Sequence, residues 1–230
     1  MAGPVAAFVQ LPADSNNTGK KNRTQTKIVG ANTVNEHFVV PSHSFTRTGY
    51  YILQTTGDVV AATSQTGTGS AFYWMNMSTL AATTNAVALI RKISVSYGIG
   101  GAIVISTASP VLNFTKYTYN GAASSAASVA PLANATGTPA PLMSVITTSS
   151  GATITLVRDV ANFVVPALVT TAGTYGGNAV IYETADPYTR GTALELKSGE
   201  GLVIYQSQAG VGSDVRKFTA HIEWDEIDIS

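Results

Sequence analysis

The sequence predicts an all-β protein built as a sandwich or a barrel. Hydrophobic residues from Phe218 to Trp224 alternate strictly with polar ones, which is typical of a strand with one buried and one solvated face. Short strand-like segments bounded by Gly and Pro also recur at intervals of about 8–12 residues. Helical periodicity is weak throughout the chain, so we expect little helix.

The composition is unusual in how few charged residues it contains. The chain has 230 residues, enough for one large β domain, and 45% of them are hydrophobic. Only 11% are charged, with 13 basic and 13 acidic residues, against about 25% charged residues in ordinary soluble domains. A surface with so few charged residues gives little protection against association. We therefore expect neighbouring subunits to cover much of it. The alternative is a Thr- and Ser-rich surface that is soluble without charge.

Several classes of function are disfavoured. There is no cysteine, which excludes disulfides, thiol catalysis and Cys-based zinc sites. The chain contains no run of about 18 apolar residues, so no membrane-spanning helix is predicted. The N-terminus matches a signal peptide poorly. The neutral charge balance argues against a general nucleic-acid binder.

Residues 1–27 differ from the remainder of the chain. Residues 14–27 are polar, basic and free of aromatics, so they cannot bury enough surface to fold alone. An apolar tip precedes them, and it favours an arm that orders on a neighbouring subunit over a disordered tail. The candidate interface residues of this arm are Val5, Phe8, Val9, Lys20, Lys21, Arg23 and Lys27.

Residues 28–230 are predicted to form one β domain. In the longest strand, 86–97, we place Leu89 on the same face as Ile93 and Val95. Residues 78–85 are the best helical candidate, with at most two turns. Residues 121–141 are low in complexity and predict a long loop within the domain. The other principal strands are predicted at 36–41, 49–53, 58–62, 71–77, 102–106, 112–119, 153–157, 162–166, 179–183, 193–197 and 202–206.

The search for chemistry gives no catalytic or cofactor motif. His221, Glu223 and Asp225 share one strand face, a pattern that suits a divalent cation, but an ordinary solvated face explains it better. We expect Trp74 and Trp224 to lie in the core. Tyr175, within the Gly-rich loop 173–177, is the best candidate for an exposed contact residue.

The two ends of the chain carry opposite charge. The basic residues of 20–27 and the acidic residues from Glu223 to Asp228 either meet between protomers or are solvated ends.

Both ends also resemble a family of tailed-bacteriophage virion proteins. In the N-terminal part the similar segments are 8–12 (FVQLP), 19–26 (GKKNRTQT) and 29–34 (VGANTV). In the C-terminal part they are 199–203 (GEGLV) and 222–226 (IEWDE). A Gly-Glu-Gly segment followed by a terminal strand ending in Glu-Trp is similar to phage structural proteins of jelly-roll type.

The resemblance implies a jelly-roll-like β-sandwich over 28–230 with an extended N-terminal arm at 1–27. It implies a non-enzymatic virion protein, assembled in the host cytoplasm without cofactor, metal, nucleic acid or membrane. We expect a homotrimeric capsid decoration or cement protein that binds the major capsid protein or other virion proteins. The alternative is a tail or head-fibre component that binds host surface carbohydrate through loops such as 173–177. A polysaccharide hydrolase is the third class.

Overall fold

The computed structural model describes residues 6–10, 21–29, 32–37, 45–77, 86–102, 105–120, 131–133, 139–147, 153–169, 175–184 and 193–229. The chain divides into two units, Met1–Ser44 and Phe45–Ser230. Every regular element in the described ranges is a β-strand, so no helix there is long and apolar enough to cross a membrane. The helix predicted at 78–85 lies outside them.

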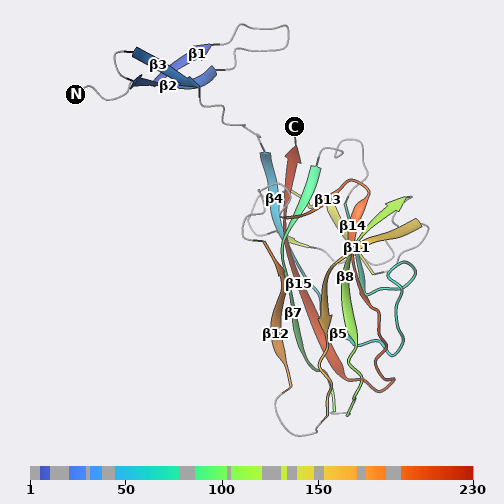
Figure 1. The fold of residues 1–230 in the computed structure, drawn as a ribbon. Helices are drawn as coiled ribbons and strands as arrows, with labels where there is room; N and C mark the ends of the chain where they lie inside the picture. The colour runs from blue at the N-terminus through green and yellow to red at the C-terminus, as the bar shows by residue number, and fades with distance from the viewer. Residues whose placement is uncertain are drawn as a thin grey trace. The chain divides into compact units, whose positions relative to one another are not determined.

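The first unit contains a three-stranded antiparallel sheet in the order β1-β2-β3 (Figure 1). Its strands are β1 (Ala6–Gln10), β2 (Lys21–Val29) and β3 (Asn32–His37). The boundary that we placed after residue 27 therefore falls inside β2.

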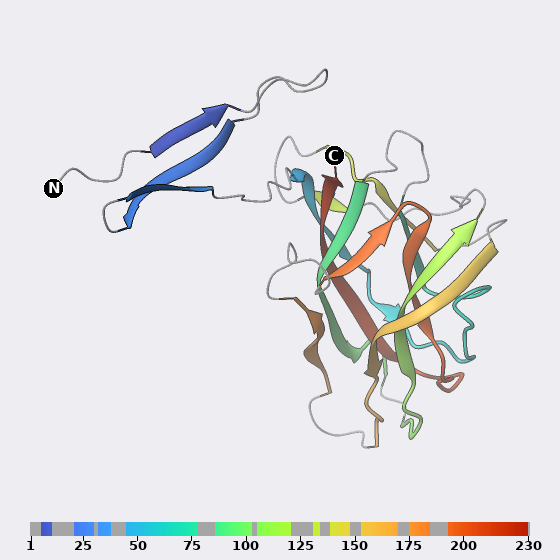
Figure 2. The same ribbon diagram turned by 45° about the horizontal axis from the view of Figure 1, so that its top comes forward.

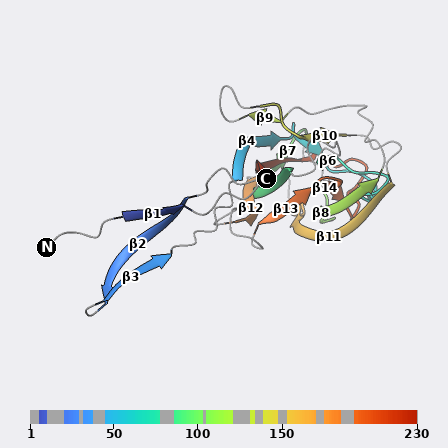
Figure 3. The same ribbon diagram turned by 90° about the horizontal axis from the view of Figure 1, so that it is seen from above.

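The second unit is a sandwich of two antiparallel sheets (Figures 2 and 3). One sheet has the order β12-β7-β15-β4-β9, with β13 paired to β7 and β5 paired to β15. The other has the order β10-β6-β14-β8-β11. The strands of the first sheet are β4 (Phe45–Gln54), β5 (Asp58–Val59), β7 (Ala86–Ile99), β9 (Leu132–Ala133), β12 (Gly177–Glu183), β13 (Leu194–Lys197) and β15 (Arg216–Ile229). Those of the second are β6 (Tyr73–Met77), β8 (Val111–Asn120), β10 (Met143–Ile146), β11 (Thr153–Val164) and β14 (Glu200–Gln206).

The strand order is that of a jelly roll. The last strand, β15, lies between β4 and β7, and β12 follows on the far side of β7. In the facing sheet, β14 lies between β6 and β8, and β11 follows β8. These two four-stranded sets are the paired sheets of an eight-stranded jelly roll. The predicted fold class, an all-β sandwich of jelly-roll type, is confirmed.

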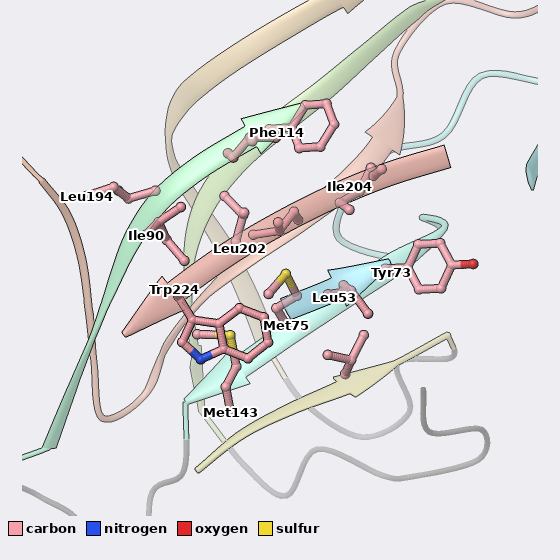
Figure 4. Close-up of a cluster of buried hydrophobic side chains, with 14 of the residues drawn as sticks. Leu53, Tyr73, Met75, Ile90, Phe114, Met143, Leu194, Leu202, Ile204 and Trp224 are labelled. Carbon is pink, nitrogen blue, oxygen red and sulfur yellow. The ribbon is translucent and has the colours of Figure 1, made fainter. Parts of the chain in front are cut away.

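The main core fills the space between the two sheets. Figure 4 shows Trp224 and Leu53 from one sheet facing Met75 and Met143 from the other. Trp224 also stacks on Tyr51, with the ring centroids 5.8 Å apart. The hydrophobic residues of the alternating segment, Phe218, Ala220, Ile222 and Trp224, are buried here as predicted.

A β-bulge at Arg91 overturns one predicted face of β7. Glu223 of β15 pairs with Lys92, but the next residue, Trp224, pairs with Ile90, so Arg91 is the extra residue. A bulge shifts the side-chain alternation by one position. Ile93 therefore lies in the main core while Leu89 lies on the opposite face of the sheet, not with Ile93 as we predicted.

The second sheet is covered on its outer face as well. Trp74, Tyr117, Val203 and Tyr205 form a separate buried cluster there. The loop before β6 closes over it, since Gly67 O accepts a hydrogen bond of 2.9 Å from the Trp74 indole. Trp74 is thus buried as predicted, although not between the two sheets.

Candidate interaction surfaces

The N-terminal sheet places its charged positions on one face. Phe8 lies directly opposite Arg23 in the register of β1 and β2. Positions two residues apart in a strand share a face, so Lys21 and Lys27 lie on the same face as Phe8 and Arg23. The register of β2 with β3 adds Glu36 to it. These four charged residues are all that the three strands contain.

The opposite face of this sheet carries no charged position. Val9 pairs with Asn22 and belongs to this face, as do Ala7 and Ile28. The remaining positions on it are Thr24, Thr26, Thr33, Asn35 and His37. The sheet thus separates a charged face from an uncharged one, and adjacent Phe8 and Val9 lie on different faces.

The strand register puts four of the predicted interface residues, Phe8, Lys21, Arg23 and Lys27, at positions on the charged face. Val5 and Lys20 lie outside the described residues. Tyr175 belongs to the other unit.

Tyr175 is half-buried rather than an exposed contact residue. Its hydroxyl donates a hydrogen bond of 2.8 Å to Pro166 O, and its ring packs edge-on against Tyr97 at 5.6 Å. Burial raises the pKa of Tyr175, against the lowering influence of Arg216. The side chain therefore links the chain just before β12 to Pro166, which follows β11, and to Tyr97 of β7.

A buried guanidinium ties together the same end of the jelly roll. Arg216 donates to Asp214 Oδ1 at 2.8 Å, to the carbonyls of Ala108 and Pro166 at 2.8 Å each, and to Ser106 Oγ at 2.9 Å. Burial alone would raise the pKa of Asp214, but the hydrogen bonds and charge of Arg216 hold it below its ordinary value. The pair is fully buried, so it joins two loops to the start of β15 and is not available to a ligand.

A buried carboxylate, that of Glu226, joins another segment of the chain to the other end of β15. Glu226 Oε2 accepts from the Leu142 amide at 2.8 Å, while Oε1 accepts from the Met143 amide at 3.0 Å and the Trp224 indole at 3.1 Å. Burial raises the pKa of Glu226, and these donors oppose the rise. Sequence reasoning treated Asp225 and Glu226 as part of an exposed acidic end, but both are fully buried.

Polar side chains on the outer face of the first sheet pair with one another. Tyr50 donates to Glu223, Arg91 lies 3.3 Å from Asp225, and its guanidinium lies over the Tyr50 ring at 5.5 Å. Burial, and then Glu223, raises the pKa of Tyr50 to about 12. His221 Nε2 lies 3.4 Å from Glu223 without hydrogen-bond geometry.

The cation-site alternative for His221, Glu223 and Asp225 gains no support from this arrangement. Within the ranges that the structure describes, no group of three or more His, Asp or Glu side chains is placed to hold a metal ion. Arg91 instead supplies positive charge to Asp225.

Comparison with known proteins adds no relative to this picture. No protein-family model, no curated protein and no solved structure matches the chain.

Proposed function

We propose that this protein is a structural component of a bacteriophage virion, a head decoration or cement protein that holds neighbouring capsid subunits together. The observation that carries the proposal is the N-terminal sheet, which separates its charged positions from its uncharged ones. The jelly-roll topology, which viral capsid proteins share with other proteins such as lectins, is consistent with it.

The first unit has little means of stabilising itself. It spans 44 residues, of which the described ones form one three-stranded sheet. A domain of about 60 residues is already marginally stable, and below about 40 residues disulfides, metals or partner chains are usually needed. The chain has no cysteine to supply such a staple. The sheet therefore gains stability by burying one face against a partner protein.

The charged face indicates which kind of surface the partner protein presents to it. Lys21, Arg23 and Lys27 follow one another along the central strand, with Phe8 beside Arg23. An acidic protein surface with an apolar recess complements this row. Each exposed ion pair contributes only about 0.2–1 kcal/mol, so firm attachment requires several copies to act together. A homotrimer, expected from the sequence, would provide such avidity.

The carbohydrate-binding alternative is less well supported. Its best aromatic contact, Tyr175, already packs on Tyr97 and hydrogen-bonds Pro166.

The proposal is tested by adding purified protein to phage heads that lack it and measuring bound copies after sedimentation. The full chain should bind, and residues 45–230 should remain folded but unbound. The double variant Lys21→Glu/Lys27→Glu should bind at least about 10-fold more weakly, and increasingly so at low salt.

The matched control is Lys197→Glu/Lys217→Glu, which makes the same charge change in the jelly-roll unit. It should bind like the unaltered chain. Binding of residues 45–230 at full occupancy would remove the N-terminal sheet from the mechanism, and binding to host cells instead of heads would favour the carbohydrate alternative.

A further inference from the structure

The described edges of the jelly roll are protected against pairing with another strand. Its two long edge strands are bulged, because the pairing of β11 with β8 shifts register twice and that of β12 with β7 shifts once. The other described strands at its edges, β5, β9, β10 and β13, have only two to four residues. Short strands and bulges both prevent an edge from offering a regular row of backbone groups to another chain.

The N-terminal sheet lacks this protection. Its described edge strands are β1 and β3, and each pairs with β2 without a register shift. β1 contains neither a charged residue nor a proline, the residue types that commonly block an edge. It lies within the segment 5–11 (VAAFVQL), which is uncharged and free of proline and glycine throughout. Such segments pair readily with a further strand when they form the edge of a sheet.

Charge distinguishes the two edges of this sheet. On the charged face, the position of Lys21 is opposite Gln10 and that of Arg23 is opposite Phe8, so both basic positions adjoin β1. The β3 edge instead carries Glu36, the one acidic residue of the three strands. Neighbouring strands lie about 4.8 Å apart, so a strand added to β1 lies about 10 Å from β2, within reach of long side chains from both strands. An acidic strand is therefore attracted at the β1 edge and repelled at the β3 edge.

We infer that the β1 edge is a strand-addition site, which takes an extended segment of the partner protein as a further strand of the N-terminal sheet. The inference rests on the proposed function and specifies how the sheet is held. The added segment has acidic residues opposite Ala6 and Gln10 on the charged face, with an apolar residue between them opposite Phe8. On the other face, small apolar residues lie opposite Ala7 and Val9. Backbone hydrogen bonds then supply affinity, and the alternating side chains supply specificity.

The site is tested with the full chain, isotope-labelled for NMR, and a synthetic peptide that holds Glu-Val-Leu-Val-Glu between Gly and Ser residues. At peptide concentrations up to about 5 mM, where weak binding is detectable, we expect saturable binding and isotope-filtered NOEs from the peptide to β1 and not to β3. A peptide with Lys in place of both Glu residues should bind at least about 5-fold more weakly, because attraction to Lys21 and Arg23 becomes repulsion.

Matched substitutions on the two edges locate the site. Phe8→Glu places a carboxylate on β1 and should weaken binding of the acidic peptide at least about 10-fold. Val34→Glu makes the same kind of change at a position on the charged face of β3, and it should alter binding by less than about 2-fold.

A third variant separates loss of the site from unfolding of the sheet. Phe8→Lys loses the same ring as Phe8→Glu but adds the opposite charge. It should bind a peptide with Glu in place of the central Leu at least as tightly as the unaltered chain binds that peptide.

The inference is overturned by absent peptide binding, by NOEs to β3, by equal binding of the acidic and basic peptides, or by a Phe8→Lys chain that binds no peptide. Pairing of β1 with β1 of a second copy, seen as NOEs between labelled and unlabelled chains, would also overturn it. Attachment to phage heads in the assay above is a separate readout. A chain that binds the acidic peptide at β1 but does not attach to heads contradicts the proposed function alone, and the reverse result contradicts this inference alone.

Discussion

At the scale of single residues, two buried charged groups hold the loops of the jelly roll to its last strand. Arg216 binds the carbonyls of Ala108 and Pro166 near the start of β15, and Glu226 binds the amides of Leu142 and Met143 near its end. A buried charge is costly unless its hydrogen-bonding capacity is met, and both groups meet it with several partners. We therefore assign both residues to stability and not to binding.

Replacing Glu226 tests this assignment. In Glu226→Gln a side-chain NH2 replaces Oε2 and faces the Leu142 N–H, which is also a donor. The Leu142 amide then keeps only its 3.0 Å bond to Oε1, and two buried donors are set against each other. We expect a loss of about 1–3 kcal/mol in the free energy of unfolding, measured by chemical denaturation, and a larger loss for Glu226→Ala. The exposed Glu183→Gln is the control and should change it by less than about 0.5 kcal/mol. An unchanged stability of Glu226→Gln would show that the carboxylate is dispensable.

The Asp214–Arg216 pair predicts a pH dependence. Asp214→Asn leaves a buried guanidinium without its counter-charge and should cost about 3–5 kcal/mol at neutral pH. Because the pKa of Asp214 is lowered in the folded state, its contribution is complete above the unfolded pKa of about 4 and is lost as the pH falls through the lower folded value. The stability difference between the two proteins should therefore shrink below about pH 4. A difference that stays constant down to pH 2 would contradict this.

At the scale of elements, the bulge in β7 decides which side chains reach the core. Before Arg91, Ala88 and Ile90 face the main core, and after it Ile93 and Val95 do. Val87 and Leu89 are thereby placed on the outer face beside Ile227 of β15. One inserted residue thus lets a single strand serve the core over its whole length while covering a second cluster outside.

Deleting Ser94 should therefore be far more damaging than deleting Arg91. Without Arg91 the bulge disappears, but Ile90 then directly precedes the outward-facing Lys92, so Ala88 and Ile90 keep facing the core. Without Ser94 the part of β7 that precedes it changes faces, which turns Ile90 and Ile93 away from the core. We expect the Ser94 deletion to be insoluble or destabilised by more than about 4 kcal/mol and the Arg91 deletion to stay folded, measured by circular dichroism and thermal unfolding. Equal damage by the two deletions would mean that the bulge does not set the phase of β7.

At the scale of the whole molecule, the described residues form a jelly roll and a separate three-stranded sheet. The jelly roll buries aromatic and aliphatic side chains from both of its sheets. Stability is therefore expected to come from residues 45–230, and attachment from the residues before them.

Thermal unfolding checks this division directly. Residues 45–230 should unfold within about 2 °C of the main transition of the full chain, because deleting the first unit removes no part of the jelly-roll core. A fall of 10 °C or more would show that the first unit stabilises the jelly roll.

The sequence predicted the fold class well because strand alternation is a local signal. The period from Phe218 to Trp224 identified a buried strand, and the structure confirms it. It did not reveal the bulge at Arg91, which is fixed by packing against β15. It also missed the burial of Glu226, whose partners are backbone amides 83 and 84 residues away in the chain. Tyr175 was misjudged for the same reason, since its partners Tyr97 and Pro166 are brought to it by the fold.

The segregation of charge in the N-terminal sheet was only half visible in the sequence. The basic residues were apparent, but their common face depends on β2 being a strand and on its register with β1 and β3.

The most direct test of the account is a cryo-electron microscopy reconstruction of the virion that carries this protein. We predict jelly-roll density on the outside of the head at every equivalent joint between capsid subunits, with the N-terminal sheet resting on an acidic surface of the shell. Density confined to the tail or to a single vertex, or a head-bound protein whose N-terminal sheet faces solvent, would contradict it.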